Sequence, residues 1–245
     1  MATIRCKHQT FENIQAVLFD KDGTLANVET YLKQLGEMRS RLIAGQVPGL
    51  QAALLSAFGL QYGQIDAAGL LAVGSREQNE VAAAAYVAAT GIGWVAALNL
   101  VTSAFEQAEA ALPRKVTQTP LLPGAAQLIL QLKSAGATLG IVSSDTHLEV
   151  AAFTQYYALS EISWYCGVSS SALPKTHPDF LQFACEALAV PLTGVLVVGD
   201  SAADAALACQ GAAGFVGLTG GWQRSPRFSP DIVSVETLSQ VEVFH

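Results

Sequence analysis

The sequence predicts an α/β fold: an open, doubly wound, mostly parallel sheet with a helical domain inserted into it. Three observations support this fold class. Short apolar runs that end in Asp, Ser or Gly-Asp recur along the chain, and helical patterns lie between them. Between the first two runs lies an insertion, residues 27–120, which is far longer than the dozen or so residues that a crossover between parallel strands needs.

The apolar runs have the length and β-branched content of strands that are buried on both faces. Three are clear: residues 14–19 before Asp20, residues 138–142 before Ser143, and residues 194–198 before Gly199-Asp200. Weaker candidates are residues 162–165, 213–217 and 232–233. Because helical patterns alternate with these runs, the strands should be parallel and joined by helical crossovers, as in a Rossmann-like core.

Four helices are expected between the later strands, over residues 124–134, 147–157, 178–189 and 202–210. Pro123 precedes the first of them, and Gly211 is a good stop signal for the last. Residues 1–26 and 121–245 are therefore predicted to form one α/β core.

The insertion, residues 27–120, is predicted to be helical from 28 to 112, with breaks near 46–49, 59–63, 74–75 and 91–93. Residues 81–105 carry no charge, which raises the question of a membrane span. Eight of the 21 residues 81–101 are the weakly apolar Ala, and Gly91 and Gly93 interrupt the stretch. We therefore expect two Ala-rich helices packed against other protein.

Composition narrows the functional classes. The 245 residues contain 13 Lys and Arg against 20 Asp and Glu, a formal net charge of −7, which argues against a nucleic-acid binder. Residues 1–13 lack the apolar core of a signal peptide, and no Cys-x-x-Cys pair is present. We expect a cytoplasmic protein without a membrane anchor. The sequence does not indicate its oligomeric state.

Ligands of open α/β sheets bind outside the carboxyl ends of the strands. At those ends the sequence places acidic and hydroxyl side chains, namely Asp20, Asp22, Ser143, Ser144, Asp200 and Asp204. Carboxylates that converge must share a proton or bind a hard cation, and oxygen donors favour Mg²⁺, which commonly engages substrate phosphate as well.

Asp20 and Asp22 are two residues apart, just past a strand. As the backbone turns, one carboxylate can act as a nucleophile and the other as a general acid and base. Taken alone, the pattern is equally typical of an Asp-Gly turn with a solvated acid beside it. The spacing by itself leaves both interpretations open.

Residues 19–25, Phe-Asp-Lys-Asp-Gly-Thr-Leu, resemble the first motif of the haloacid dehalogenase superfamily. Ser143 matches the second motif, Lys175 the third, and residues 199–204 the fourth, in the expected order. The position of the insertion is similar to that of the helical-cap subgroup, which includes phosphoglycolate phosphatase and β-phosphoglucomutase. The resemblance covers most of the predicted core.

The resemblance implies a role for each matched residue. Asp20 would attack phosphorus and become an aspartyl-phosphate, while Asp22 would protonate the leaving oxygen and then activate water. Ser143, Ser144 and Lys175 would bind the phosphoryl group. The Mg²⁺ ligands would be Asp20, the Asp22 backbone carbonyl, Asp200 and Asp204, or Asp204 would instead hold Lys175 in place.

The resemblance also implies the reaction class. Dehalogenases of the superfamily lack the second acid, so Asp22 favours phosphoryl transfer to water from a small soluble phosphate ester. The alternatives are a phosphomutase of the β-phosphoglucomutase type and a non-catalytic binding or regulatory relative. Lys21, Asn27 and Thr176 depart from the commoner residues of the motifs. In the insertion, Arg39, Arg41 and Arg76 are interpreted as solvated surface charges, with binding of a distal anion as the alternative.

Overall fold

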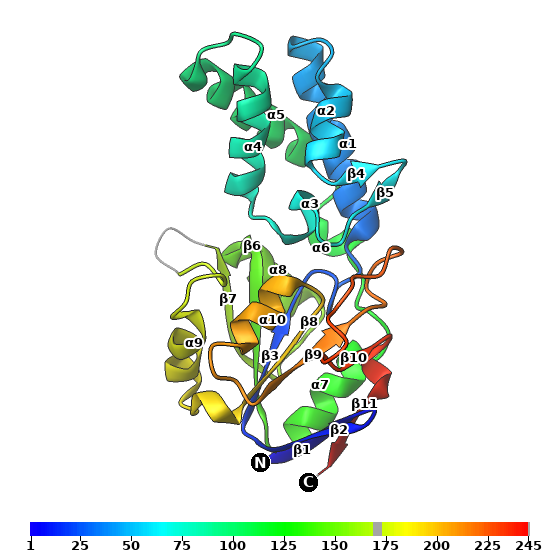
Figure 1. The fold of residues 1–245 in the computed structure, drawn as a ribbon, viewed down its shortest axis with the longest axis vertical. Coiled ribbons are helices and arrows are strands. Elements are labelled where there is room, and N and C mark those ends of the chain that lie inside the picture. Colours follow the sequence, from blue (N-terminus) through cyan, green and yellow to red (C-terminus); the bar gives the residue numbers. More distant parts are fainter. Residues whose placement is uncertain (169–172, 245) are drawn as a thin grey trace. The chain divides into compact units, whose positions relative to one another are not determined.

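The structure is a computed structural model that describes residues 1–168 and 173–244. The chain divides into two compact units (Figure 1). The core unit comprises Met1–Asn27 and Pro120–His245, and the insertion unit comprises Val28–Thr119.

The core unit is built on a six-stranded parallel sheet with the strand order β10-β9-β8-β3-β6-β7. Its strands, in chain order, are β3 (Ala16–Asp20), β6 (Thr138–Thr146), β7 (Ile162–Val168), β8 (Val195–Gly199), β9 (Gly214–Leu218) and β10 (Ser234–Val235). The predicted doubly wound parallel sheet is confirmed. The strand order reverses beside β3, because the chain runs outward through β6 and β7 and then returns to β8. Such a switch point is where open α/β sheets bind ligands.

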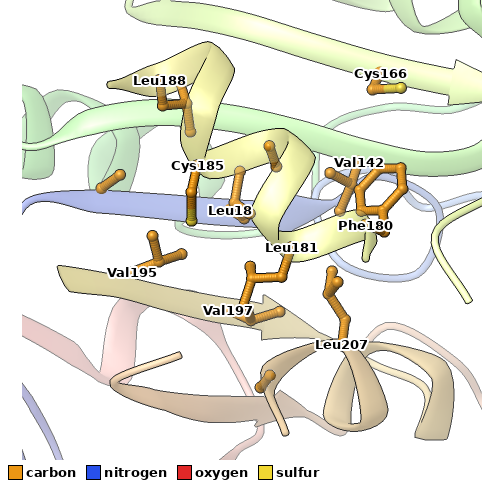
Figure 2. Packing of buried hydrophobic residues seen from close by; sticks show 13 residues of the cluster. Leu18, Val142, Cys166, Phe180, Leu181, Cys185, Leu188, Val195, Val197 and Leu207 are labelled. Atoms are coloured by element: carbon orange, nitrogen blue, oxygen red, sulfur yellow. The ribbon is translucent and has the colours of Figure 1, made fainter. Parts of the chain in front are cut away.

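Four longer helices connect these strands: α7 (Ala125–Ser134), α8 (His147–Tyr156), α9 (Phe180–Leu188) and α10 (Ala202–Ala208). Right-handed crossovers and the reversed strand order place α7 and α8 on one face of the sheet and α9 and α10 on the other. The second pair shares one hydrophobic cluster with the sheet, in which Leu181 and Leu207 pack toward Leu18 and Val197 (Figure 2). This packing fixes α10, whose first turn carries Asp204, against the strand that ends before Asp200.

A second, antiparallel sheet of three strands was not predicted. It has the order β11-β1-β2, formed by β1 (Ala2–Cys6), β2 (Gln9–Ile14) and β11 (Val241–Phe244). The predicted strand over residues 14–19 is therefore wrong at its start: Ile14 ends β2, and β3 begins at Ala16. Asn13, with a φ of 60°, lies inside β2 where the pairing with β1 changes register. The described part of the core unit also contains the 3₁₀ turns η1 (Leu192–Gly194) and η2 (Leu238–Gln240).

The insertion unit consists mainly of helices, namely α1 (Glu29–Gln46), α2 (Gln51–Ala57), α3 (Leu70–Val73), α4 (Arg76–Ala88), α5 (Trp94–Ala111) and α6 (Lys115–Gln118). The expectation of helix throughout 28–112 is wrong in one place. A two-stranded antiparallel ribbon, β4 (Leu60–Gln61) and β5 (Gln64–Ile65), occupies the predicted break around Gly59 and Gly63. The uncharged stretch 81–105 falls on α4 and α5, and none of the helices that the structure describes is long and apolar enough to cross a membrane.

Arg39 is not the solvated charge that the sequence suggested. It is buried, its guanidinium carbon lies 3.9 Å from the centroid of the Phe105 ring, and its Nη2 donates to Glu109 Oε1 at 2.8 Å. Arg76 Nε lies 3.2 Å from the same carboxylate oxygen. Within the insertion unit these two charges join α1, α4 and α5.

Candidate active site

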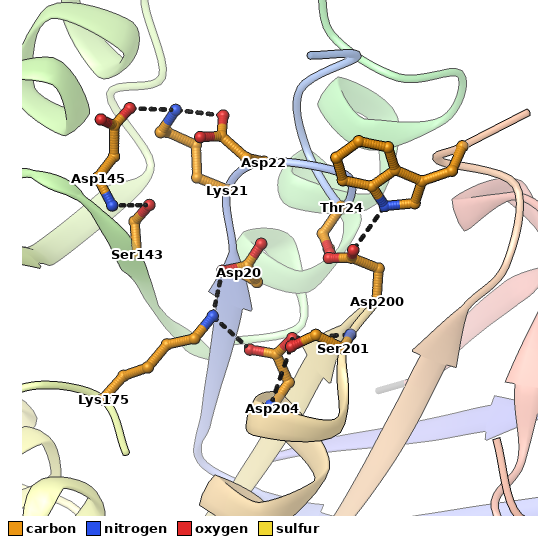
Figure 3. Close-up of polar contacts among 11 residues, drawn as sticks. Asp20, Lys21, Asp22, Thr24, Ser143, Asp145, Lys175, Asp200, Ser201 and Asp204 are labelled. Atoms are coloured by element: carbon orange, nitrogen blue, oxygen red, sulfur yellow. Dashed lines mark hydrogen bonds and ion pairs between the residues drawn. The ribbon is translucent and has the colours of Figure 1, made fainter. Parts of the chain in front are cut away.

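Three adjacent strands of the core unit, β3, β6 and β8, position several of the predicted site residues (Figure 3). Asp20, the last residue of β3, pairs with Val142 of β6, and Phe19 pairs with Val198 of β8. On the β6 side of Asp20, Ser143 is the residue after its partner Val142. On the β8 side, Asp200 is two residues after Val198, the partner of Phe19. The register of three parallel strands gathers residues that are far apart in the chain.

A tight loop after β3 holds Asp20 and Asp22 in place. The backbone carbonyl of Lys21 accepts from the amides of Leu25 at 2.9 Å and Ala26 at 2.8 Å. Gly23 has a φ of +86°, and a Cβ there would lie 2.6 Å from Asp200 Oδ2 and would overlap the Trp222 indole. Glycine is required at this position because the backbone both turns and approaches the site closely.

Lys175 lies at the centre of the acidic residues. Its Nζ donates to Asp20 Oδ1 at 2.6 Å and to Asp204 Oδ1 at 2.8 Å, and the residue is buried. The Lys175 loop is tethered by Gln210, whose Nε2 donates to the His177 carbonyl at 2.9 Å. Gln210 was not anticipated, since a glutamine at the end of a helix carries no distinctive pattern.

Asp200 has two partners that sequence reasoning missed. Thr24 Oγ1 donates to its Oδ1 at 2.8 Å, and Trp222 Nε1 donates to its Oδ2 at 2.7 Å. Thr24 lies inside the first motif, but Trp222 comes from the loop after β9. The only sequence signal for Trp222 is the pair Gly220-Gly221 before it, which permits a close backbone approach. Both donors orient the carboxylate at the end of β8.

Asp204 holds two elements together. Its Oδ2 accepts from the Ser201 amide at 3.0 Å, and the Ser201 hydroxyl in turn accepts from the Asp204 amide, so the pair forms a capping box on α10. Its Oδ1 accepts from Lys175. Asp204 was expected either to bind the metal or to hold Lys175 in place. The second role requires a contact between Asp204 and Lys175, and the structure contains this contact.

Ser143 and Ser144 lie in β6, but not at its end as predicted. The strand continues to Thr146, although its pairing with β3 stops at Val142. Ser143 Oγ accepts from the Asp145 amide at 3.1 Å, and a hydroxyl that accepts in this way still has its own hydrogen to donate. Ser143 is buried and Ser144 is half-buried.

The carboxylate of Asp22 lies outside the group that its neighbours form. Asp20, Asp200 and Asp204 each offer a carboxylate oxygen, and these atoms lie within 4.8 Å of one another. Asp22 Oδ1 instead contacts Lys21 Nζ, which also lies 3.0 Å from Asp145 Oδ2. The resemblance implies only the backbone carbonyl of Asp22 as a metal ligand, and this placement of its carboxylate does not contradict that expectation.

The electrostatics of the cluster reflect three buried carboxylates around one ammonium. Burial raises the pKa of Asp20 well above its usual range, and the charges of Asp204 and Asp200 add to this against the opposing effect of Lys175. Burial and the Asp204 charge raise the pKa of Asp200 to about 6. Burial alone would lower the pKa of Lys175, but its two carboxylate partners outweigh this and raise it. The cluster therefore holds more negative charge than one ammonium balances.

This excess charge predicts a pH-dependent stability of the metal-free protein. Because the pKa of Asp200 is raised from 3.8 to about 6, the folded state binds more protons than the unfolded state between these values. Stability must then fall as pH rises through this window. Relative to Asp200→Asn, the unfolding free energy of the wild type should drop by a few kcal/mol between about pH 4 and pH 7. Urea denaturation in EDTA measures this difference, and a difference that rises with pH would contradict the electrostatic account.

Comparison with known proteins places this site in a family. The sequence profile of the haloacid dehalogenase-like hydrolases matches residues 14–210. Among solved structures, one described as a predicted phosphoglycolate phosphatase from Haemophilus somnus has 20% identity and a TM-score of 0.67, covering 93% of this chain and 96% of its own. A candidate haloacid dehalogenase-like hydrolase from Bacteroides fragilis has 20% identity and a TM-score of 0.64, covering 93% and 99%.

A subfamily IA hydrolase of the same superfamily, from Geobacter sulfurreducens, has 18% identity and a TM-score of 0.55, with 93% of this chain and 94% of that chain covered. The sequence matched none of the curated proteins with which it was compared. At 18–20% identity the solved structures show only that the fold is shared. The sequence profile is evidence for the family, because it matches most of the chain. The profile match, together with the fold, shows that the chain belongs to the haloacid dehalogenase-like hydrolases.

Proposed function

We propose that this hydrolase is a Mg²⁺-dependent phosphatase that hydrolyses a small phosphomonoester through an aspartyl-phosphate on Asp20. The observation that carries the proposal is the buried Asp20 carboxylate at the carboxyl end of a central strand, with Lys175 Nζ 2.6 Å away. A nucleophile and a cation in contact suit attack on an anionic phosphate, which needs charge compensation. The names of several similar structures, among them a predicted phosphoglycolate phosphatase, agree with this reaction class.

The donor set fits a hard divalent cation. Three buried carboxylates, Asp20, Asp200 and Asp204, offer oxygens within 4.8 Å of one another, and their charge exceeds that of Lys175. We propose that these residues, with the Asp22 backbone carbonyl, hold Mg²⁺. When bound, the ion would offset negative charge on the phosphoryl group.

The residues of the chain would act in two steps. A carboxylate oxygen of Asp20 attacks phosphorus, the bond from phosphorus to the ester oxygen breaks, and the proton of the Asp22 carboxyl group goes to that oxygen. Asp22 then takes a proton from a water that attacks the aspartyl-phosphate, which releases phosphate and restores Asp20. Lys175, Ser143 and Ser144 would bind phosphoryl oxygens throughout.

Turnover of small phosphate esters tests the function. Purified protein with Mg²⁺ should hydrolyse p-nitrophenyl phosphate and at least one metabolite in a panel of phosphomonoesters that includes phosphoglycolate. EDTA should lower kcat by on the order of 10²-fold or more, because an ion of this kind contributes several kcal/mol to the transition state. Added Mg²⁺ should restore the rate. Absence of turnover across the panel, with or without Mg²⁺, would contradict the proposal.

The fate of the phospho-enzyme distinguishes the phosphatase from a phosphomutase. A phosphatase transfers the phosphoryl group to water, so no bisphosphate forms when a sugar phosphate is added. Transfer to a sugar phosphate, detected as a bisphosphate product, would favour the phosphomutase instead.

A further inference from the structure

Lys21 is a buried lysine that the mechanism above does not use. It lies between the two proposed catalytic aspartates in sequence, and it is 1% exposed. Its ammonium contacts Asp22 Oδ1 and lies 3.0 Å from Asp145 Oδ2 (Figure 3). The other buried lysine, Lys175, pairs with Asp20 and Asp204. The two lysines thus serve different aspartates.

The position of the Lys21 ammonium is set by residues of β6 and α8. Its Nζ lies 5.5 Å from the centroid of the Phe153 ring, within the range of a cation–π interaction. Asp145 Oδ1 accepts from the Thr146 amide at 3.2 Å, while the Asp145 amide donates to Ser143 Oγ. Asp145 is therefore held at both its backbone and its side chain, and Lys21 is held by Asp145.

The backbone at Lys21 is fixed as well, because its carbonyl accepts from the amides of Leu25 and Ala26. Both ends of the Lys21 side chain are therefore restrained, and the ammonium contacts Asp22 Oδ1 from a fixed position. Burial of an ammonium is unfavourable unless it is paired, so an apolar residue would suit this position if packing alone mattered. The pairing with Asp22 and Asp145 accounts for a charged residue here.

We propose that Lys21 is a positioning residue for Asp22, and that the Lys21–Asp145 pair holds the Asp22 carboxyl group where it can protonate the leaving oxygen. This inference rests on the proposed function. In the first step the ester oxygen leaves phosphorus and takes the Asp22 proton, so the rate depends on where that carboxyl group lies. A displacement of about 1 Å lowers such rates by about 100-fold.

The leaving group supplies a selective test. An alkyl phosphate such as glycerol 2-phosphate needs a proton on its leaving oxygen, whereas p-nitrophenolate is a weak base and leaves without one. In Lys21→Met, kcat/KM for glycerol 2-phosphate should fall about 10- to 100-fold, and kcat/KM for p-nitrophenyl phosphate should stay within about threefold. When both kcat/KM values are measured on one sample, their ratio does not depend on the fraction of the protein that is folded.

Asp145→Asn provides a second variant that acts through the same contact. It should shift the ratio in the same direction by a smaller factor, and the double variant should be no more selective than Lys21→Met alone. The control is Lys133→Met, which removes the same charge from an exposed position in the last turn of α7 and should leave the ratio unchanged. If Lys21→Met does not fold, Asp145→Asn carries the test.

Equal losses for both esters in Lys21→Met and Asp145→Asn would overturn the inference, since they would show a structural role only. Faster hydrolysis of glycerol 2-phosphate would also overturn it, because Lys21 would then hold Asp22 away from the leaving group. Failure of the proposed function gives a different result: the wild type would hydrolyse no ester of the panel, or Asp20→Asn would hydrolyse both test esters at the wild-type rate. That result removes the proposed function and this inference together.

Discussion

Asp20→Asn should lower kcat for every phosphate ester by on the order of 10⁴-fold or more, because an amide cannot form the aspartyl-phosphate. The variant should nevertheless fold. The change conserves shape and removes one of three carboxylates that lie within 4.8 Å of one another, while Lys175 keeps its contact with Asp204 at 2.8 Å. Loss of like-charge repulsion should leave the metal-free variant at least as stable as the wild type.

Steady-state kinetics and thermal denaturation in EDTA measure the two parts of this prediction. Asp231→Asn is a matched control, since it makes the same charge change at an exposed residue of the core unit. Its kcat should equal that of the wild type. Activity of Asp20→Asn within tenfold of the wild type would contradict the nucleophile assignment, and a lower melting temperature would contradict the account of the acidic cluster.

Lys175→Met should lower both activity and stability. Its ammonium is buried and donates to Asp20 and Asp204 at 2.6 and 2.8 Å, so its removal takes from both buried carboxylates the cation that they contact among the described residues. The loss of one partner of a buried ion pair destabilises a protein by about 3–5 kcal/mol. The kcat should fall by about 10²- to 10³-fold, as for other donors that stabilise transition-state charge.

Metal ions should distinguish this effect from a simple packing defect. Denaturation at pH 7.5 in EDTA should show the full loss of stability, and saturating Mg²⁺ should recover a larger share of stability in Lys175→Met than in the wild type. Lys133→Met is the control and should change neither stability nor the response to Mg²⁺. A metal-free Lys175→Met protein as stable as the wild type would show that the ammonium does not balance the acidic cluster.

Much of the core could be predicted from local patterns. Buried parallel strands are short apolar runs, and β6 and β8 begin within a residue of where the pattern placed them. The first run was harder to interpret because it crosses from β2 to β3 at Gln15, where two sheets meet. The strands β1, β2 and β11 were missed because a small antiparallel sheet joins the two ends of the chain, and no local signal records such pairing.

In the candidate site, too, some residues could be predicted from local sequence patterns and others could not. Asp20, Lys175 and Asp204 were expected to converge. In the structure Lys175 Nζ donates to both carboxylates. Trp222 was not expected, although its indole donates to Asp200, because a loop residue after β9 reaches the site only through the packing of that loop. The burial of Arg39 cannot be predicted from the sequence, because charge alone does not show that Phe105 and Glu109 surround it.

The sequence by itself determined the α/β core and placed Asp20 and Asp200 at the ends of strands, because each of these depends on a pattern within a few neighbouring residues. Only the tertiary structure decided which partner each charge has. Thr24 and Asp200 are 176 residues apart, and Lys175 and Asp20 are 155 residues apart. Such contacts depend on the register of the parallel strands and on loop packing, which bring Lys21 to Asp145 and Lys175 to Asp20. A lysine directly after β3 and a lysine in a distant loop thus serve different aspartates, because the fold places each of them beside its own partners.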